Sequence, residues 1–120
     1  MSRHDELIRL RHMLDAAKKA VELTRGRTPK KLEGDEIRVL ALERLFEILG
    51  EAASQTTPEI RARYPEVPWS RAVGMRNEII HGYATVDLDV VLRTIERDLP
   101  ALIAQLETAL RGPKPDLKRD

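Results

Sequence analysis

The stretch RNEIIHGY, residues 76–83, gathers the side chains of this chain that are best suited to chemistry. It holds Arg76 and, five residues later, His81. An arginine carries a fixed positive charge and a planar fork of donors that matches phosphate oxygens, whereas a histidine can transfer protons near neutral pH. Together these two side chains indicate a reaction at a phosphodiester.

RNA strand scission requires both of these functions. The ribose 2′-hydroxyl loses a proton as it attacks the neighbouring phosphorus, and the leaving 5′-oxygen gains one. A cation stabilises the additional negative charge on the phosphorus centre. We therefore expect Arg76 to bind the phosphate and His81 to transfer protons. The alternative is a structural histidine near the end of a buried helix, and the residues alone leave it open.

The sequence offers few side chains for metal or thiol chemistry. The chain of 120 residues has no cysteine, which excludes disulfides, thiolate zinc sites and cysteine nucleophiles. The histidines at positions 4, 12 and 81 do not follow a metal-ligand spacing such as HExxH. We expect neither a metal nor another cofactor.

The charge of the chain does not by itself favour a dedicated nucleic-acid-binding protein, since its formal net value is only +1. The distribution is uneven, because Lys18–Lys31 carries six cations and one acid, whereas Glu33–Glu51 carries six acids and two cations. Both segments are most simply solvated helix surface, and a path for RNA along the basic segment is the alternative. The charged start and the lack of a long apolar run predict a cytoplasmic protein without a membrane span.

The spacing of apolar residues predicts long amphipathic helices that must position residues 76–83. The first, at about 5–23, has Leu7, Leu10, Leu14, Ala17 and Val21 on one face, and a short helical turn follows at 30–32. The second covers about 35–55. Its expected inner stripe is Ile37, Ala41, Leu45, Ile48 and Ala52, widened by Leu42, Phe46 and Leu49.

Proline and capping residues mark the later elements. Thr57 and Pro58 open a short helix that ends before Pro65, and a third principal helix is predicted over 69–81, ending at Gly82. Its inner side holds Trp69, Val73, Ile80 and either Met75 or Arg76. A last long helix begins after Thr85 or Asp87 and continues past Pro100 to about Leu110.

No segment alternates with a period of two, so we predict an all-α fold: an antiparallel bundle of four to five helices with additional short helical turns. Residues 1–111 form its single domain, and residues 112–120, which are mostly charged residues and prolines, form a disordered tail.

The site is incomplete in a single copy of the chain. On an ideal helix Arg76 and His81 point about 140° apart, which favours a wide cleft reached from two sides. The reaction also calls for two proton carriers, and the motif supplies one histidine. A two-fold homodimer whose shared cleft holds both copies of the motif would supply the second.

These same residues resemble the signature R-x-x-x-x-H-x-Y of the HepT-like branch of the HEPN domains, through Arg76, His81 and Tyr83. Asn77 matches the common R-N opening of that signature. The segments LERLFEILGEAA, YPEVPWSRAVGMRN and GYATVDLDVVLRTIERDLPALIAQLE are similar as well, so that the resemblance covers about residues 5–110.

The resemblance implies a helical toxin of a toxin–antitoxin pair that acts as a metal-independent endoribonuclease with Arg76 and His81 as its catalytic pair. It implies a homodimer with a composite cleft, and a nucleotidyltransferase antitoxin of the MntA type, which can assemble with the toxin into a higher oligomer. That partner would transfer AMP to Tyr83 and thereby silence the toxin, because a bulky anionic adduct repels RNA phosphate. Asn77 would orient His81 or contact RNA, and Glu51 would position the arginine.

The alternative interpretation is that the protein belongs to a different functional class. Domains of this kind also serve as interaction modules, so the chain would bind the nucleotidyltransferase without cutting RNA. Trp69 and Met75 are expected in the core in either case.

Overall fold

The computed structural model of the chain describes residues 2–79 and 87–111, and all of the regular elements within these ranges are helices. The three long ones are α1 (Arg3–Thr24), α3 (Glu36–Ser54) and α7 (Leu88–Leu110). The four short ones are α2 (Pro29–Glu33), α4 (Pro58–Arg63), α5 (Trp69–Gly74) and α6 (Arg76–Ile79). The predicted all-α class is confirmed. Among the described helices, none combines the length and apolar character that crossing a lipid bilayer requires.

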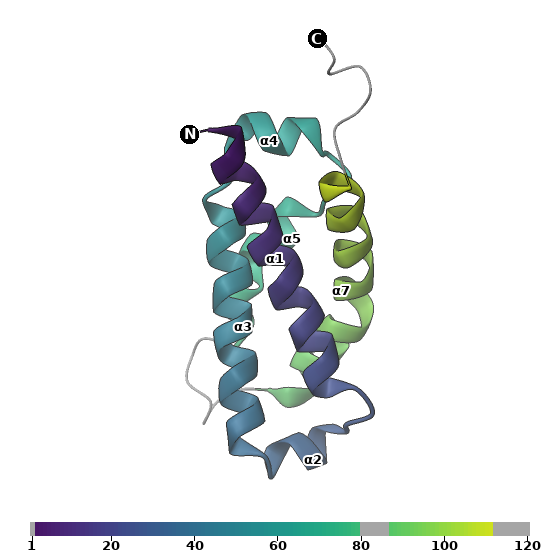
Figure 1. Cartoon of the computed structure of the whole chain (residues 1–120). Helices are drawn as coiled ribbons and strands as arrows, with labels where there is room; N and C mark the ends of the chain where they lie inside the picture. Colours follow the sequence, from purple (N-terminus) through teal and green to yellow (C-terminus); the bar gives the residue numbers. More distant parts are fainter. Residues whose placement is uncertain (1, 80–86, 112–120) are drawn as a thin grey trace.

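The long helices lie side by side and alternate in direction (Figure 1). In this view α1 descends, α3 rises beside it, α5 lies behind and α7 rises on the far side, while α2 and α4 cross the two ends. Helix α1 packs against both α3 and α7, and α5 and α6 pack against α3. The bundle is therefore antiparallel as expected, with two short helices in its fourth position.

One hydrophobic core joins the described helices, and the stripe predicted for α1 faces it, as does an apolar stripe of α7 at helical spacing: Val91, Leu92, Ile95, Leu99, Leu102 and Leu106. The stripe predicted for α3 was displaced around the helix, since Ile37 is 80% exposed and Ala41, Leu45 and Ile48 are only half-buried. The reason is that α3 packs against α1 on one side and against α5 and α6 on another. Its buried face is therefore centred on the residues expected only to widen the stripe: Leu42, Phe46 and Leu49, continued by Ala53.

The third principal helix was predicted as one element, and this was wrong. Helix α5 ends at Gly74, the Met75 N–H bonds to the Ala72 carbonyl at 3.3 Å in a tighter turn, and α6 starts at Arg76. The break follows a glycine, whose helix propensity is low. Met75 is fully buried and Trp69 nearly so, as expected of core residues. The end predicted at Gly82 and the tail predicted at 112–120 lie outside the described residues.

Hydrogen bonds hold the link between α3 and α5 in place. Arg61 of α4 donates to the Ala53 carbonyl and to the Thr56 hydroxyl, both at 2.8 Å, and its guanidinium lies 5.9 Å from the ring centre of Trp69. The Trp69 indole N–H donates in turn to the Tyr64 carbonyl at 3.0 Å. These contacts fix the position at which α5 begins, and α5 and α6 then occupy the fourth position of the bundle.

Thr57 caps α4 and Asp87 caps α7, as the sequence predicts, and Thr28 caps α2. Thr57 has a further role, because its hydroxyl accepts from the Ile60 N–H at 3.2 Å and donates to the buried Glu6 carboxylate at 2.6 Å. This hydroxyl thus ties the start of α4 to α1.

Thr57→Ala should lower the free energy of unfolding by about 2 kcal/mol, because it removes a cap and leaves a buried carboxylate oxygen without its donor. Urea unfolding followed by circular dichroism measures this loss. Thr28→Ala is the matched control, since Thr28 caps α2 with the same 3.2 Å acceptor geometry but is exposed. It should cost only about 1 kcal/mol. Equal losses in the two variants would contradict a role for the Glu6 contact.

Candidate functional site

Arg76 lies unusually close to helix α3. A Cβ atom added to Gly50 would be 2.9 Å from the Arg76 Cβ and 3.1 Å from its Cγ. Non-bonded carbon atoms normally stay about 3.5–4.0 Å apart, so any side chain at position 50 would displace Arg76. Gly50 is therefore the flat place on α3 along which the stem of Arg76 lies.

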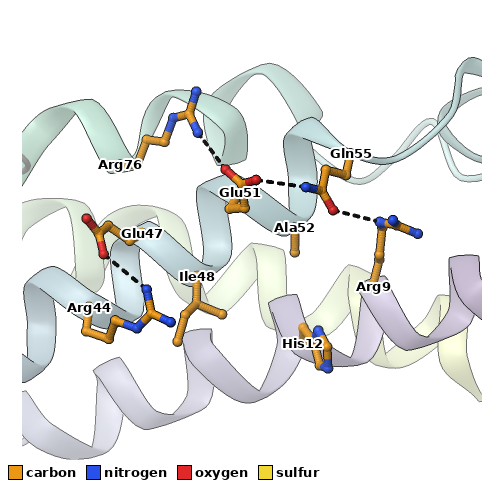
Figure 2. Close-up of a pocket in the computed structure, with 9 residues that line it drawn as sticks. All are labelled: Arg9, His12, Arg44, Glu47, Ile48, Glu51, Ala52, Gln55 and Arg76. Atoms are coloured by element: carbon orange, nitrogen blue, oxygen red, sulfur yellow. Dashed lines mark hydrogen bonds and ion pairs between the residues drawn. The ribbon is translucent and has the colours of Figure 1, made fainter.

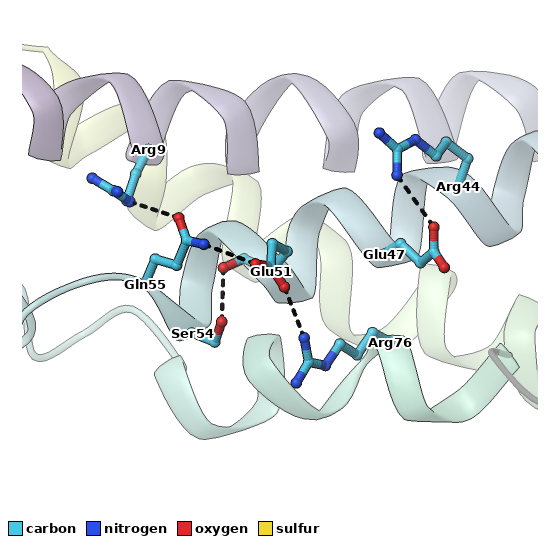
Figure 3. Close-up of polar contacts among 7 residues, drawn as sticks. All are labelled: Arg9, Arg44, Glu47, Glu51, Ser54, Gln55 and Arg76. Carbon is cyan, nitrogen blue, oxygen red and sulfur yellow. Dashed lines mark hydrogen bonds and ion pairs between the residues drawn. The ribbon is translucent and has the colours of Figure 1, made fainter.

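The guanidinium of Arg76 is held by a carboxylate one residue beyond this glycine. Its Nη1 lies 2.9 Å from Oε1 of Glu51. The other oxygen of Glu51 accepts from the Gln55 amide at 2.8 Å, and the Gln55 carbonyl accepts from Nε of Arg9 at 3.1 Å. Figure 3 shows this chain of contacts running from α6 across α3 to α1.

The contact between Arg76 and Glu51 orients the arginine more than it stabilises the fold. Their side chains are 37% and 57% exposed, and ion pairs this open to water contribute less than about 1 kcal/mol. The contact also occupies only Nη1, whereas a guanidinium has five N–H donors. Arg76 can therefore receive an oxyanion without first losing a strong bond.

The same residues border a cleft of about 380 Å³ between α1, α3 and α6 (Figure 2). Helix α3 forms the middle of the cleft, with Arg76 on one side and α1 on the other. Ile48 and Ala52 of α3 give the cleft an apolar patch. Its polar side chains are Arg9, His12, Arg44, Glu47, Glu51, Gln55 and Arg76.

Charges of both signs meet along α3. Glu43, Glu47 and Glu51 follow one another at intervals of four residues, a spacing that places like charges on one side of a helix. Burial raises the pKa of Glu43 above its ordinary value, and the Glu47 carboxylate raises it further. Arg44 lies 3.3 Å from Glu47 and so offsets its charge, as Arg76 does for Glu51.

Chemically, this arrangement suits a polyanion better than a small apolar ligand. Three arginines from three different helices border one open cleft, and their planar forks match phosphate oxygens. No cluster of three or more histidine or carboxylate side chains able to hold a metal ion occurs among the residues that the structure describes.

The predicted site residues are brought together in part. Arg76 and Glu51 are in direct contact, and Asn77 is exposed on α6 beside them. His81 and Tyr83 lie outside the described residues, so their predicted roles remain predictions.

The α1 wall of the cleft is not among the features predicted from the sequence. There His12 is considered only as a metal ligand and Arg9 is not singled out, yet both border the cleft with Arg76. Both residues are more than sixty positions away from Arg76 in the chain. A usable signal is the spacing of Arg9 and His12, three residues apart, which places them on one side of α1.

Comparison with known proteins shows the family to which the chain belongs. The protein family described as ribonuclease HepT-like matches residues 13–109, which include Gly50, Glu51 and the complete signature from Arg76 to Tyr83. No solved structure matches the chain significantly.

Individual relatives cover most of the chain. A protein of Caldanaerobacter subterraneus subsp. tengcongensis, named as a candidate RNase, is 30% identical over 105 residues, which are 88% of this chain and 94% of the relative. Another candidate RNase, from Methanocaldococcus jannaschii, is 29% identical over 107 residues, or 89% of this chain and 98% of that protein. A probable ribonuclease HepT of Thermococcus cleftensis is 34% identical over 73 residues, covering 61% of this chain and 66% of the relative. The chain therefore belongs to the ribonuclease HepT-like family.

Proposed function

We propose that this protein is a metal-independent endoribonuclease that cuts RNA with Arg76 and His81. The observation that carries the proposal is the placement of Arg76, which Gly50 admits to the surface of α3 and Glu51 orients at an arginine-bordered cleft. Membership of a ribonuclease family and the names of its relatives support the same activity.

In this mechanism the 2′-oxygen attacks the adjacent phosphorus and the bond from phosphorus to the 5′-oxygen breaks, which leaves a 2′,3′-cyclic phosphate and a 5′-hydroxyl. Arg76 binds a non-bridging oxygen and offsets the charge that develops on the phosphorus centre. His81 transfers a proton, and Asn77 orients His81 or contacts the RNA. Glu51 is a positioning residue that acts through Arg76.

A homodimer completes this mechanism, because one motif supplies one histidine for two proton transfers. An isologous interface would bring two copies of Arg76 and His81 to one shared cleft. An enzyme that is strictly monomeric in solution yet fully active would contradict this part of the proposal.

The protein would be the toxin of a pair whose antitoxin is a nucleotidyltransferase of the MntA type. That partner would attach AMP to the Tyr83 hydroxyl and release pyrophosphate from ATP. Tyr83 is two residues from His81, so an anionic adduct there would repel the phosphates of RNA from the site. The resemblance of Arg76, His81 and Tyr83 to the signature of the family supports this proposed regulation.

Purified protein in a chelating buffer should cut single-stranded RNA and leave cyclic or 3′-phosphate ends. Arg76→Ala and His81→Ala should each lower the rate at least about 100-fold, since each removes charge stabilisation or proton transfer from the transition state. Cleavage is followed on a labelled oligonucleotide, with circular dichroism to verify the fold.

Arg63→Ala is the matched control for the arginine, because Arg63 is exposed on α4 and does not border the cleft. It should retain full activity. Cutting that persists in His81→Ala would remove His81 from the mechanism. A folded wild-type protein that binds a nucleotidyltransferase but never cuts RNA would favour the interaction module instead.

Gly50→Ala should lower the cleavage rate about tenfold or more while the protein stays folded, because the new methyl group displaces the backbone and stem of Arg76. Its effect on stability should be small. Overpacking costs about 1–3 kcal/mol, and the better helix propensity of alanine returns up to about 1 kcal/mol of that.

Gly34→Ala is the control for this substitution, because a Cβ atom at Gly34 would lie 3.8 Å from the Lys31 carbonyl oxygen, which is an ordinary contact. Gly34 is exposed at the end of α2 and does not border the cleft, so the same chemical change there should leave the rate unaltered. If both glycine variants cleave equally fast, the close approach of Arg76 to α3 does not matter for catalysis.

Incubation with a nucleotidyltransferase of the MntA type and ATP should raise the intact mass of the protein by whole units of AMP and abolish RNA cleavage. Tyr83→Phe lacks the acceptor hydroxyl, so it should neither gain mass nor lose activity. Mass spectrometry measures the first effect and the cleavage assay the second. A mass gain that persists in Tyr83→Phe would place the modification elsewhere.

A further inference from the structure

The cleft at Arg76 does not end at its α1 wall. A second hollow of about 370 Å³ lies next to it and shares three of its residues, His12, Arg44 and Ile48. We call the two together the α1–α3 groove. The second hollow extends the groove along α1 as far as Lys19.

This extension combines an apolar floor with a polar rim. Ala16, Leu45 and Ile48 supply the floor, and all three are buried or half-buried. Lys19 and Arg44 supply cations at the rim, one from each helix. Lys19 is exposed and forms no salt bridge within the described part of the chain, so its charge is available to a ligand.

We propose that the second hollow of the α1–α3 groove binds the nucleotide next to the scissile phosphate, with Lys19 contacting the phosphate of the flanking linkage. The inference rests on the proposed ribonuclease function and adds a binding subsite to it. Arg44 borders both hollows and so lies where the strand passes from one to the other.

Several features favour an RNA strand over other occupants. Consecutive phosphates of a single strand need cations at intervals along one path, and Arg76, Arg44 and Lys19 supply them from α6, α3 and α1. A base has apolar faces, which suit the floor. The carboxylate of Asp15 at the same hollow can accept a hydrogen bond from the amino group of a base, as acidic side chains do with cytosine.

The neighbouring lysine provides a stringent control. Lys18 is on the same helix and has the same charge, but its ammonium lies 3.0 Å from Glu107 of α7, away from the groove. The two lysines are adjacent in sequence and point about 100° apart around α1. A general loss of positive charge would affect both alike, whereas a subsite affects only Lys19.

The test measures binding of a short single-stranded RNA in which every 2′-hydroxyl is methylated, so that it cannot be cut. In the full-length protein, Lys19→Gln should weaken binding about fivefold in fluorescence anisotropy. It should also reduce the slope of log affinity against log salt by about 0.7, the value for one lost phosphate contact on a single strand. Lys18→Gln should alter neither quantity.

The outcomes separate this proposal from the nuclease assignment. If the wild-type protein binds the methylated RNA with the predicted Lys19 dependence but fails to cut ordinary RNA, the result supports the subsite in the α1–α3 groove and contradicts the ribonuclease activity. If it cuts RNA but Lys19→Gln and Lys18→Gln bind alike, the subsite is overturned. A Lys19→Gln variant whose RNA binding is unaltered but whose sedimentation shows a different oligomeric state would identify the groove as a protein contact, which also overturns the proposal.

Discussion

The close approach of Arg76 to α3 is the constraint on which the site depends. A single missing side chain at Gly50 lets α6 pack near enough for the stem of Arg76 to lie along α3. Glu51 is the next residue on that helix, and it is therefore within reach of the guanidinium. In the proposed mechanism, substrate binding and helix packing share this one contact. The direction of Arg76 is set by its close approach to the backbone of α3, and the ion pair with Glu51 refines it.

The break after Gly74 allows Trp69 and Arg76 to face different surroundings. In an unbroken helix, Arg76 would lie only about 20° from Trp69 around the axis, because seven residues complete nearly two turns. Trp69 is buried, so the arginine would be directed at the core. With the helix interrupted, Met75 is fully buried in the core and Arg76 remains half-exposed at the cleft.

Local signals in the sequence predict the helices of the bundle, but they do not predict which residues meet at the cleft. Caps such as Thr57 and the apolar spacing of α1 and α7 depend on neighbours within one or two turns, and these predictions held. The exposure of Ile37 depends on which helices surround α3, and the proximity of His12 to Arg76 depends on how α1 crosses it. These features arise from tertiary packing, and the periodicity of residues along one helix does not predict how helices pack together. The arginine and its carboxylate could be chosen from motif and resemblance, but their 2.9 Å contact could not.

The acidic side of α3 also has a place in a site for RNA. An arginine surrounded only by cations would hold any polyanion tightly and without a preferred direction, whereas Glu51 keeps Nη1 of Arg76 in place before substrate arrives. Because this pair is exposed, it is weak enough for an incoming phosphate to share the guanidinium with the carboxylate. Preorganising a cation in this way reduces the conformational entropy that must be lost in the transition state, which is where an interaction accelerates a reaction. In the proposed mechanism the carboxylate would thus lower the ground-state affinity for phosphate and favour the geometry of the reaction, a combination that suits an enzyme better than a protein that only binds RNA.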